Sequence, residues 1–378
     1  GWSALTAITT GASNVAIGSS ALAAVVGGDD NVAVGQNALS AATVTSKNTA
    51  IGTGALSGLD KGSGGTQYTS GNIGIGHNAL VGGVPASGSF VFNIAIGNDA
   101  LNSTGTSAGI TGTIAIGASA LTALTTGANN IAIGYQAMLE DAESDSNVVI
   151  GYEAAFNTNN QNMDENVFIG KRSGGGQWAG IGRFNVAVGK DSMSGGISGA
   201  ANNVALGHSA LAAVVGGDNN VAVGSGAAKA ILRGVDNVAI GMNAMTALAG
   251  DVADNGGIRN IAIGREAMGA VNPGTHDSAL ADDNIAIGYQ ALKGASFVGE
   301  DKDLKNNIAI GTYALTSTGT NAQNGTVAIG YSALIALTSG AANTAIGYQA
   351  AAELSDNSHN TVVGYQAMYR ICSYFRSK

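Results

Sequence analysis

A short repeat covers almost the whole of this 378-residue chain and limits what it can fold into. The motif is Asn-Val/Ile-Ala-Ile/Val-Gly-x-x-Ala-Leu/Met, and we count 19 copies, from residues 14–22 to residues 360–368. Neighbouring copies are 17 to 24 residues apart. Repeats of this length are typical of solenoids, in which each unit buries its apolar side against the next. The apolar period is 2 rather than 3.6, which favours strands over helices. The sequence therefore predicts an all-β solenoid with one coil per repeat.

The centre of each motif predicts a short strand. The residue before the motif Gly is Ile in 14 copies, and the residue two positions earlier is usually Val or Ile. Side chains at i and i+2 share one face of a strand, and the Ala between them lies on the other face. We expect Val and Ile inside the coil and Ala outside, where a second layer packs closely. The predicted core isoleucines include Ile17, Ile51, Ile96, Ile133, Ile240, Ile287 and Ile346.

The motif Gly predicts a tight bend that a Cβ atom would obstruct. We expect the Ala-Leu/Met pair after it to begin a second short strand. The Ala three residues after the Gly, present in 17 copies and replaced by Ser173 and Ser192 in the others, should be tightly packed. The predicted turn glycines include Gly18, Gly52, Gly97, Gly134, Gly241, Gly288 and Gly347.

The motif begins with Asn in 17 copies, and Thr113 and Thr326 are the exceptions. One amide per coil at the same position can form a hydrogen-bonded ladder along the stack. The alternative is the ordinary preference of Asn for turns. The ladder would include Asn14, Asn31, Asn48, Asn130, Asn237 and Asn284.

The repeat also sets the domain organisation. Residues 1–368 form the repeat region, which starts in mid-repeat at Gly1 and thus predicts further sequence upstream. Residues 369–378 abandon the repeat, and we expect a cap or the start of a further domain. The stretch 20–29 recurs unchanged at 209–218, which indicates duplication of a larger block.

Composition excludes several classes of protein. The net charge is −9, whereas a nucleic-acid-binding surface is basic. Gly, Asn or Asp interrupts every apolar run well below the roughly 20 residues that a spanning helix needs, so we expect no membrane insertion by this segment. Cys372 is the only cysteine, which leaves no disulfide framework. Only 11% of residues are charged, which suggests that other chains cover much of the surface.

The motif resembles the head repeat of YadA-type trimeric autotransporter adhesins. It is more similar still to the longer form with Gly-Tyr-Gln-Ala-Leu in bacteriophage tail-fibre proteins. Here that form appears at residues 134–138, 288–292 and 347–351, with Met, Leu and Ala respectively in the last position. The resemblance implies a left-handed parallel β-roll and a homotrimer. It implies a structural fibre of a virion, the rod of a phage tail fibre that attaches to a host-surface receptor. The alternative is the head of a bacterial adhesin on the outer surface, and an ice-binding solenoid is a minor alternative.

No residues form a pattern that predicts catalysis, so we expect no enzyme, no cofactor and no resident metal. The four histidines, at 77, 208, 276 and 359, lack metal-ligand spacing, and no Gly-rich stretch has the phosphate-loop pattern. Acidic clusters at 140–145, 164–165, 282–283 and 300–303 lie in linkers. We interpret them as solvated loops, with calcium binding as the open alternative.

Two features remain as candidates for recognition of a receptor, which could be a glycan. Tyr331, Tyr348 and Tyr365 each follow the motif Gly in consecutive copies, so they should stack along the solenoid. They could contact a receptor, or they could pack between coils or chains. The longest linkers, near 246–259, 269–283 and 293–306, should project as neighbouring loops that could also hold binding residues.

Overall fold

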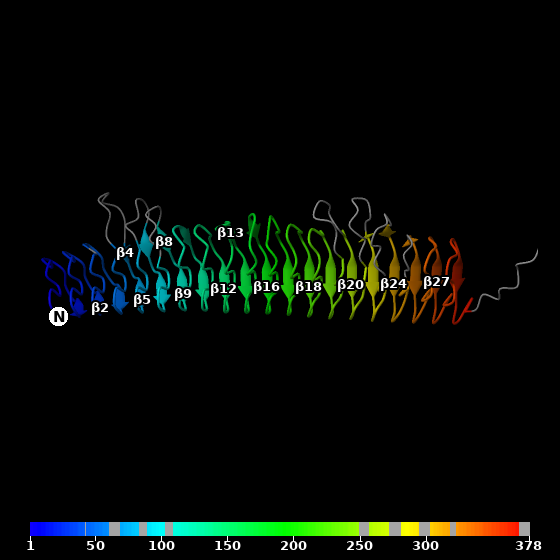
Figure 1. The fold of residues 1–378 in the computed structure, drawn as a ribbon, viewed down its shortest axis with the longest axis horizontal. Helices are drawn as coiled ribbons and strands as arrows, with labels where there is room; N and C mark the ends of the chain where they lie inside the picture. The colour runs from blue at the N-terminus through cyan, green and yellow to red at the C-terminus, as the bar shows by residue number, and fades with distance from the viewer. Residues whose placement is uncertain are drawn as a thin grey trace, which may run out of the picture. The chain divides into compact units, whose positions relative to one another are not determined.

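The computed structural model of the chain describes residues 1–41, 43–59, 69–82, 89–102, 109–248, 257–271, 281–294, 303–317 and 323–369. These residues form strands, turns and bends, with no helix among them. The chain divides into two compact units, Gly1–Asn185 (unit 1) and Val186–Lys378 (unit 2). Within each unit the three-residue strands stand side by side as a row of parallel arrows (Figure 1).

Unit 1 stacks one strand from each repeat. Val15 pairs with Val32 and Val32 pairs with Thr49, so each strand is in register with the same motif position of the next repeat. Two-residue strands form shorter parallel ladders on another side of the coil. The main strands are β1 (Val15–Ile17), β2 (Val32–Val34), β3 (Thr49–Ile51), β5 (Ile73–Ile75), β7 (Ile94–Ile96), β9 (Ile114–Ile116), β11 (Ile131–Ile133), β12 (Val148–Ile150) and β14 (Val167–Ile169). The short strands are β4 (Thr69–Ser70), β6 (Phe90–Val91), β8 (Ile110–Thr111), β10 (Gly127–Ala128), β13 (Met163–Asp164) and β15 (Gly182–Arg183).

Unit 2 repeats this arrangement, again with parallel pairing throughout its described strands. Its main strands are β16 (Val186–Val188), β17 (Val204–Leu206), β18 (Val221–Val223), β19 (Val238–Ile240), β20 (Ile261–Ile263), β22 (Ile285–Ile287), β24 (Ile308–Ile310), β26 (Val327–Ile329), β27 (Thr344–Ile346) and β28 (Thr361–Val363). Its short strands are β21 (Ala281–Asp282), β23 (Leu304–Lys305) and β25 (Gln323–Asn324). The predicted all-β parallel solenoid with one coil per repeat is confirmed.

The predicted orientation of the strands is wrong. The central Ala of the strand faces the interior and is fully buried in copies such as Ala132 and Ala239, whereas the flanking Val and Ile face outward. Of the seven isoleucines predicted as core, Ile17, Ile51, Ile240, Ile287 and Ile346 are exposed, and Ile96 and Ile133 are half-buried. The core consists instead of Ala and of Leu or Met from the following corner.

The narrow width of the coil explains this orientation. Gly74 occupies the central strand position in β5, and a Cβ atom there would clash with the side chain of Leu56 in the preceding coil. Leu at the corner therefore leaves room for little more than a methyl group at the strand centre. β14 has Phe168 at this position, and the corner of the same coil has Gly174 instead of Leu, where a Cβ atom would clash with the Phe168 ring. The buried Phe168 ring packs edge-on against Trp178 with centroids 6.0 Å apart. Large and small residues exchange places within a fixed volume.

The motif Gly forms the corner after each strand, as predicted. All 19 copies have positive φ, for example 143° at Gly134, and a Cβ on Gly134 would clash with the carbonyl oxygen of Gly151 in the next coil. The Ala-Leu/Met pair directly after this Gly forms a turn and not a strand in the described residues, which corrects that part of the prediction. The second strand, where present, precedes the motif Asn. The corner instead has left-handed backbone at the second and fourth positions after the Gly, as at Ser20 (φ 56°) and Leu22 (φ 51°).

The Ala three residues after the Gly is fully buried in every described copy that carries it except the last, and Ser173 and Ser192 are buried too. Replacing Ala244 with Leu should therefore overpack the coil and lower the free energy of unfolding by about 1–3 kcal/mol. The matched control is Met242→Leu in the same corner, because the Met242 side chain is exposed; it should change stability by less than about 0.5 kcal/mol. Urea unfolding measures both, and equal stability of the two variants would contradict tight packing at Ala244.

The predicted asparagine ladder is confirmed. The backbone N–H and the side-chain Nδ2 of Asn31 both donate to Oδ1 of Asn14, each at 3.0 Å, and Nδ2 also donates to the carbonyl of Thr45 at 2.7 Å. The same bonds recur between successive coils, as the following ladder members show: Asn48 on Asn31, Asn147 on Asn130, Asn237 on Asn220, and Asn284 on Asn260. Each amide thus satisfies buried polar groups that the corner would otherwise leave without partners.

A second ladder, which the sequence analysis missed, lies two residues before the Asn. There a side-chain oxygen accepts a bond from the backbone N–H at the same position of the preceding coil, as from Ala201 to Asp218 (2.8 Å) and from Ile258 to Asp282 (2.9 Å). Ser and Asn serve as well as Asp, because any short side chain with an oxygen reaches the neighbouring coil. Many of the linker acidic residues are therefore part of the scaffold.

Candidate binding surfaces

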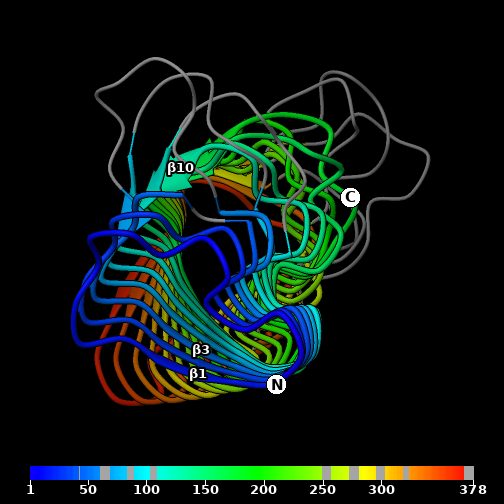
Figure 2. The ribbon, with the colours of Figure 1, turned by 90° about the vertical axis from the view of Figure 1, so that its left-hand side faces the viewer.

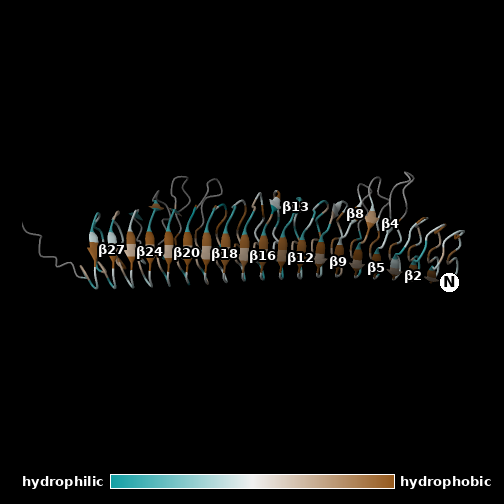
Figure 3. Ribbon diagram, turned by 180° about the vertical axis from the view of Figure 1, so that it is seen from behind, coloured by the Kyte–Doolittle hydropathy of each residue, from teal (hydrophilic) through white to brown (hydrophobic). Residues whose placement is uncertain are grey.

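The outward Val and Ile residues form an apolar strip along the main strands of each unit, here called the Val/Ile strip. It comprises the first and third residues of the main strands, which are Val or Ile except at Thr49, Leu206, Thr344 and Thr361. Its members in unit 2 include Val188, Ile240, Ile287 and Ile346, each 36–38% exposed. Hydropathy colouring shows the main strands as hydrophobic bands (Figure 3). Monomeric proteins rarely expose contiguous apolar patches beyond a few hundred Å². A strip that recurs on every coil therefore favours coverage by another chain.

The corner after the main strands of unit 2 carries a continuous row of aromatic rings. Tyr331, Tyr348 and Tyr365 stack with centroids 5.1 and 5.3 Å apart and planes 11° from parallel. The row continues through Tyr313 and Tyr289 in the two preceding coils, where the contacts are edge-on at 6.1 and 5.3 Å. We call these five residues the tyrosine row. The predicted stacking is confirmed, whereas the predicted contact with a receptor remains a prediction.

Polar side chains border the tyrosine row. Gln366 donates to Gln349 at 2.8 Å beside the stacked rings. At the other end, the Arg265 guanidinium lies 5.8 Å from the centroid of Tyr289. The neighbouring Glu266 accepts bonds from Lys293 (2.8 Å) and Gln290 (2.7 Å), and these bonds hold the pKa of its carboxyl below the ordinary value. A cationic and polar cluster thus ends a row that is itself uncharged.

Unit 1 has a shorter version of the same feature. Tyr135 and Tyr152 stack at 5.3 Å, and the Lys171 ammonium lies 5.0 Å from the centroid of Tyr152. A hydrogen bond with Glu153 raises the pKa of Tyr152. This pair offers a matched control for experiments on the longer row.

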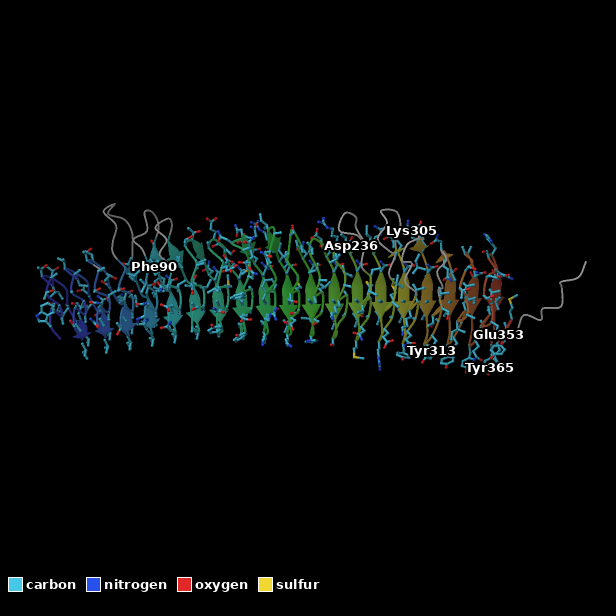
Figure 4. The ribbon with its side chains drawn as sticks, viewed as in Figure 1. Phe90, Asp236, Lys305, Tyr313, Glu353 and Tyr365 are labelled. Carbon is cyan, nitrogen blue, oxygen red and sulfur yellow. The ribbon has the colours of Figure 1, made fainter. Side chains whose placement is uncertain are left out.

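Both rows lie at a corner that faces solvent in the single chain. The position after the motif Gly holds Lys190, His208 and Arg265 in other coils of unit 2, and charged side chains are rarely buried. Tyr313 and Tyr365 lie at one edge of the unit 2 coils, and Asp236 and Lys305 lie at the opposite edge (Figure 4). The first coils of unit 1, drawn in blue to cyan, lie one behind another when viewed end-on (Figure 2). Residues at one motif position therefore share one surface.

Two of the acidic clusters contain a carboxylate that is paired with an arginine of an adjacent coil. Arg183 lies 2.9 Å from Asp164, and Arg259 contacts both carboxylate oxygens of Asp283 at 2.6 and 2.9 Å. Within the described residues, no three His, Cys, Asp or Glu side chains converge as metal ligands would. His77, His208 and His359 are exposed, and His276 lies outside the described residues.

One acidic residue is buried. Asp141 occupies a core position that holds Leu124 in the preceding coil, and burial raises the pKa of its carboxyl to about 7. Its Oδ1 accepts bonds from the backbone N–H groups of Glu143 (3.2 Å) and Ser144 (3.1 Å), whereas Oδ2 is buried with no partner among the described residues. This arrangement favours the neutral carboxylic acid.

The predicted site residues thus have different roles. The Asn and Gly sets hold the coils together, the Ile set forms the Val/Ile strip, and Tyr331, Tyr348 and Tyr365 form part of the tyrosine row. Sequence reasoning missed Tyr313, because it follows the Gly by two positions rather than one. Its spacing of 18 residues from Tyr331 was the available signal. Most of the linkers predicted to carry recognition lie outside the described residues, as do residues 370–378.

No helix in the described part of the chain is long and apolar enough to cross a membrane.

Comparison with known proteins adds no family assignment. No protein-family model matches the sequence, and no curated protein sequence is significantly similar to it.

Proposed function

We propose that this chain is a structural fibre protein, the repeat rod of a homotrimeric, phage-type viral tail fibre that attaches to a host surface. The observation that carries the proposal is the Val/Ile strip, an apolar surface that recurs on every coil of a chain with only 11% charged residues. Burying this strip between chains removes it from water. The resemblance of the repeat to trimeric fibre and adhesin repeats selects three chains.

The structure changes which side chains the trimer would use. Ala had been expected outside, at a close contact between chains, but Ala lies inside each coil. The Val and Ile side chains would instead meet around the trimer axis. β-branched side chains in register, one pair per coil, pack well against an equivalent surface because their rotamers are restricted.

Sedimentation equilibrium of the purified chain should give about three times the 37.0 kDa chain mass. A soluble monomer at micromolar concentration would contradict the proposed homotrimer.

The double variant Ile287→Lys/Ile346→Lys should dissociate the trimer, because each chain would bring two charges into an apolar contact at a cost of several kcal/mol per buried ion. The β-sheet signal in the circular dichroism spectrum should persist in the dissociated chain, since both positions are exposed in one chain. Thr312→Lys, at the solvent-facing corner, is the matched control and should stay trimeric. A trimer that survives the double variant would place the interface elsewhere.

The same trimer could serve as the head of a bacterial adhesin, which is the second candidate. The flanking sequence of the gene separates the two: a virion-attachment or chaperone domain supports the fibre, and a membrane-anchor barrel supports the adhesin.

A further inference from the structure

We infer that the tyrosine row of unit 2 is a binding site for a neutral, linear polysaccharide that lies along the solenoid axis. This inference rests on the proposed attachment function and assigns its site and ligand class. It builds on Tyr289, Tyr313, Tyr331, Tyr348 and Tyr365 together with the adjoining amides.

The row is accessible in a way that the Val/Ile strip of the proposed trimer is not. Tyr331, Tyr348 and Tyr365 are 42%, 43% and 73% exposed. The equivalent corner position in other coils holds charged or polar side chains, as at Lys190 and His208. Burial of this corner between chains would take those polar and charged groups out of water, which costs free energy. The corner therefore remains open to a ligand when the strip is covered.

The rings are held in place before any ligand binds. Each stacked tyrosine has a neighbour at 5.1–5.3 Å on the adjacent coil, and Gln366 is tied to Gln349. Side chains that are already ordered lose little conformational entropy on binding, which favours affinity. Because stacking occupies part of each ring face, the ligand would meet ring edges and phenolic hydroxyls.

The chemistry of the row fits a carbohydrate. A phenolic hydroxyl both donates and accepts hydrogen bonds, and a glutamine amide offers donors and acceptors side by side. These groups match the hydroxyl-rich, partly apolar surface of a sugar ring. From Tyr289 to Gln366, the two positions after each motif Gly hold only Tyr, Gln, Thr and Ser. With no charge along these five coils at the row itself, the site is suited to a neutral chain.

The periodicity favours a polymer over a folded protein partner. Successive tyrosines come from adjacent coils at the strand spacing of about 4.8 Å, so the same group recurs at a constant interval. A linear polysaccharide presents the same group at a constant interval along its length, whereas a folded protein surface does not. Several weak contacts made in parallel then raise the overall affinity.

The test uses the full-length trimer, fluorescently labelled, and a panel of fixed bacterial cells covering both envelope types. We expect binding to at least one species, loss of binding after periodate oxidation of cell-surface sugars, and retention after proteinase treatment. Binding should also stay constant as ionic strength rises, because screening weakens only charged contacts. The double variant Tyr348→Ala/Tyr365→Ala should reduce affinity about tenfold or more.

Two control variants separate the site from a general effect on the protein. Tyr135→Ala removes an exposed tyrosine of the two-ring row in unit 1 and should leave binding unchanged. Tyr348→Phe keeps the ring stack but removes one hydroxyl and should weaken binding less than Tyr348→Ala.

The outcomes are distinguishable. Binding that survives periodate but not proteinase, or that is indifferent to the tyrosine variants, overturns this inference and leaves the attachment function intact. Binding that falls steeply with salt overturns the neutral ligand. A trimer that binds no cell in the panel overturns the attachment function and this inference with it.

Discussion

Replacing Asn147 with Ala should lower the free energy of unfolding by about 3–5 kcal/mol. Asn147 is fully buried, and its Nδ2 donates to Asn130 Oδ1 (3.0 Å), Asp145 O (3.0 Å) and Met163 O (2.6 Å). Its Oδ1 accepts from the backbone N–H of Asn166 at 2.9 Å. Alanine removes all of these bonds and leaves buried groups in two coils without partners. Urea unfolding at fixed protein concentration measures the loss.

The matched control is Asn98→Ala, at an exposed corner position of unit 1, which should change stability by less than about 0.5 kcal/mol. The ladder also predicts that one substitution raises the free energy of unfolding. Thr113 interrupts the ladder: its N–H donates to Asn93 Oδ1 at 3.0 Å, but its buried Oγ1 has no partner among the described residues. Thr113→Asn should restore the ladder and raise stability by about 1 kcal/mol. Equal stability of Asn147→Ala and the wild type would show that the ladder contributes nothing.

The contribution of Asp141 to the free energy of unfolding should decrease by about 4 kcal/mol as pH rises from 4 to 7. Burial raises the pKa of this carboxyl from 3.8 to about 7 in the folded chain. Between these two values the folded state holds a proton that the unfolded state releases, so unfolding becomes easier as pH rises. The contribution is fully present below about pH 4 and is lost above about pH 7. This direction is opposite to that of a carboxylate in an ion pair.

Asp141→Leu should remove this pH dependence and stabilise the protein at pH 8, because Leu occupies the equivalent position at Leu124 in the preceding coil. Asp164 is the nearby carboxylate that raises the Asp141 pKa further, and it remains in the variant. Asp30→Asn, at an exposed position with φ of 58° that Asn tolerates, should keep the wild-type slope. Thermal unfolding between pH 4 and pH 8 distinguishes these variants, and an unchanged slope in Asp141→Leu would contradict the role of this group.

Several features of the protein could be predicted from sequence because the repeat shows them 19 times over. Regular spacing with a period-2 centre is sufficient for a parallel solenoid. An amide at a constant position implies a ladder, and a constant Gly implies a corner that excludes a side chain. The stacking of Tyr331, Tyr348 and Tyr365 follows from register alone. These inferences hold because each one depends only on which residues recur at the same place in successive coils.

Other features could not be predicted because they depend on tertiary packing. The left-handed backbone at Leu22 is disfavoured locally and persists because its N–H bonds to Ala38 O in the next coil at 3.1 Å. The burial of Asp141 also conflicts with the ordinary preference of an acidic residue for solvent. In both cases tertiary packing overrides what the residue favours by itself.

The orientation of the main strands shows most clearly where sequence alone was insufficient. Strand alternation determined that Ala and the Val/Ile pair lie on opposite faces, but it could not determine which face is inside. Hydrophobicity by itself would place Ile240 inside and Ala239 outside, and the structure has the reverse. The deciding factor is volume. Where Leu or Met from the corner fills the narrow coil, little more than a methyl group fits at the strand centre, whereas the coils with Ala155 and Gly174 at the corner hold Val149 and Phe168 there. The larger β-branched side chains are therefore left on the surface, where only another chain can remove them from water.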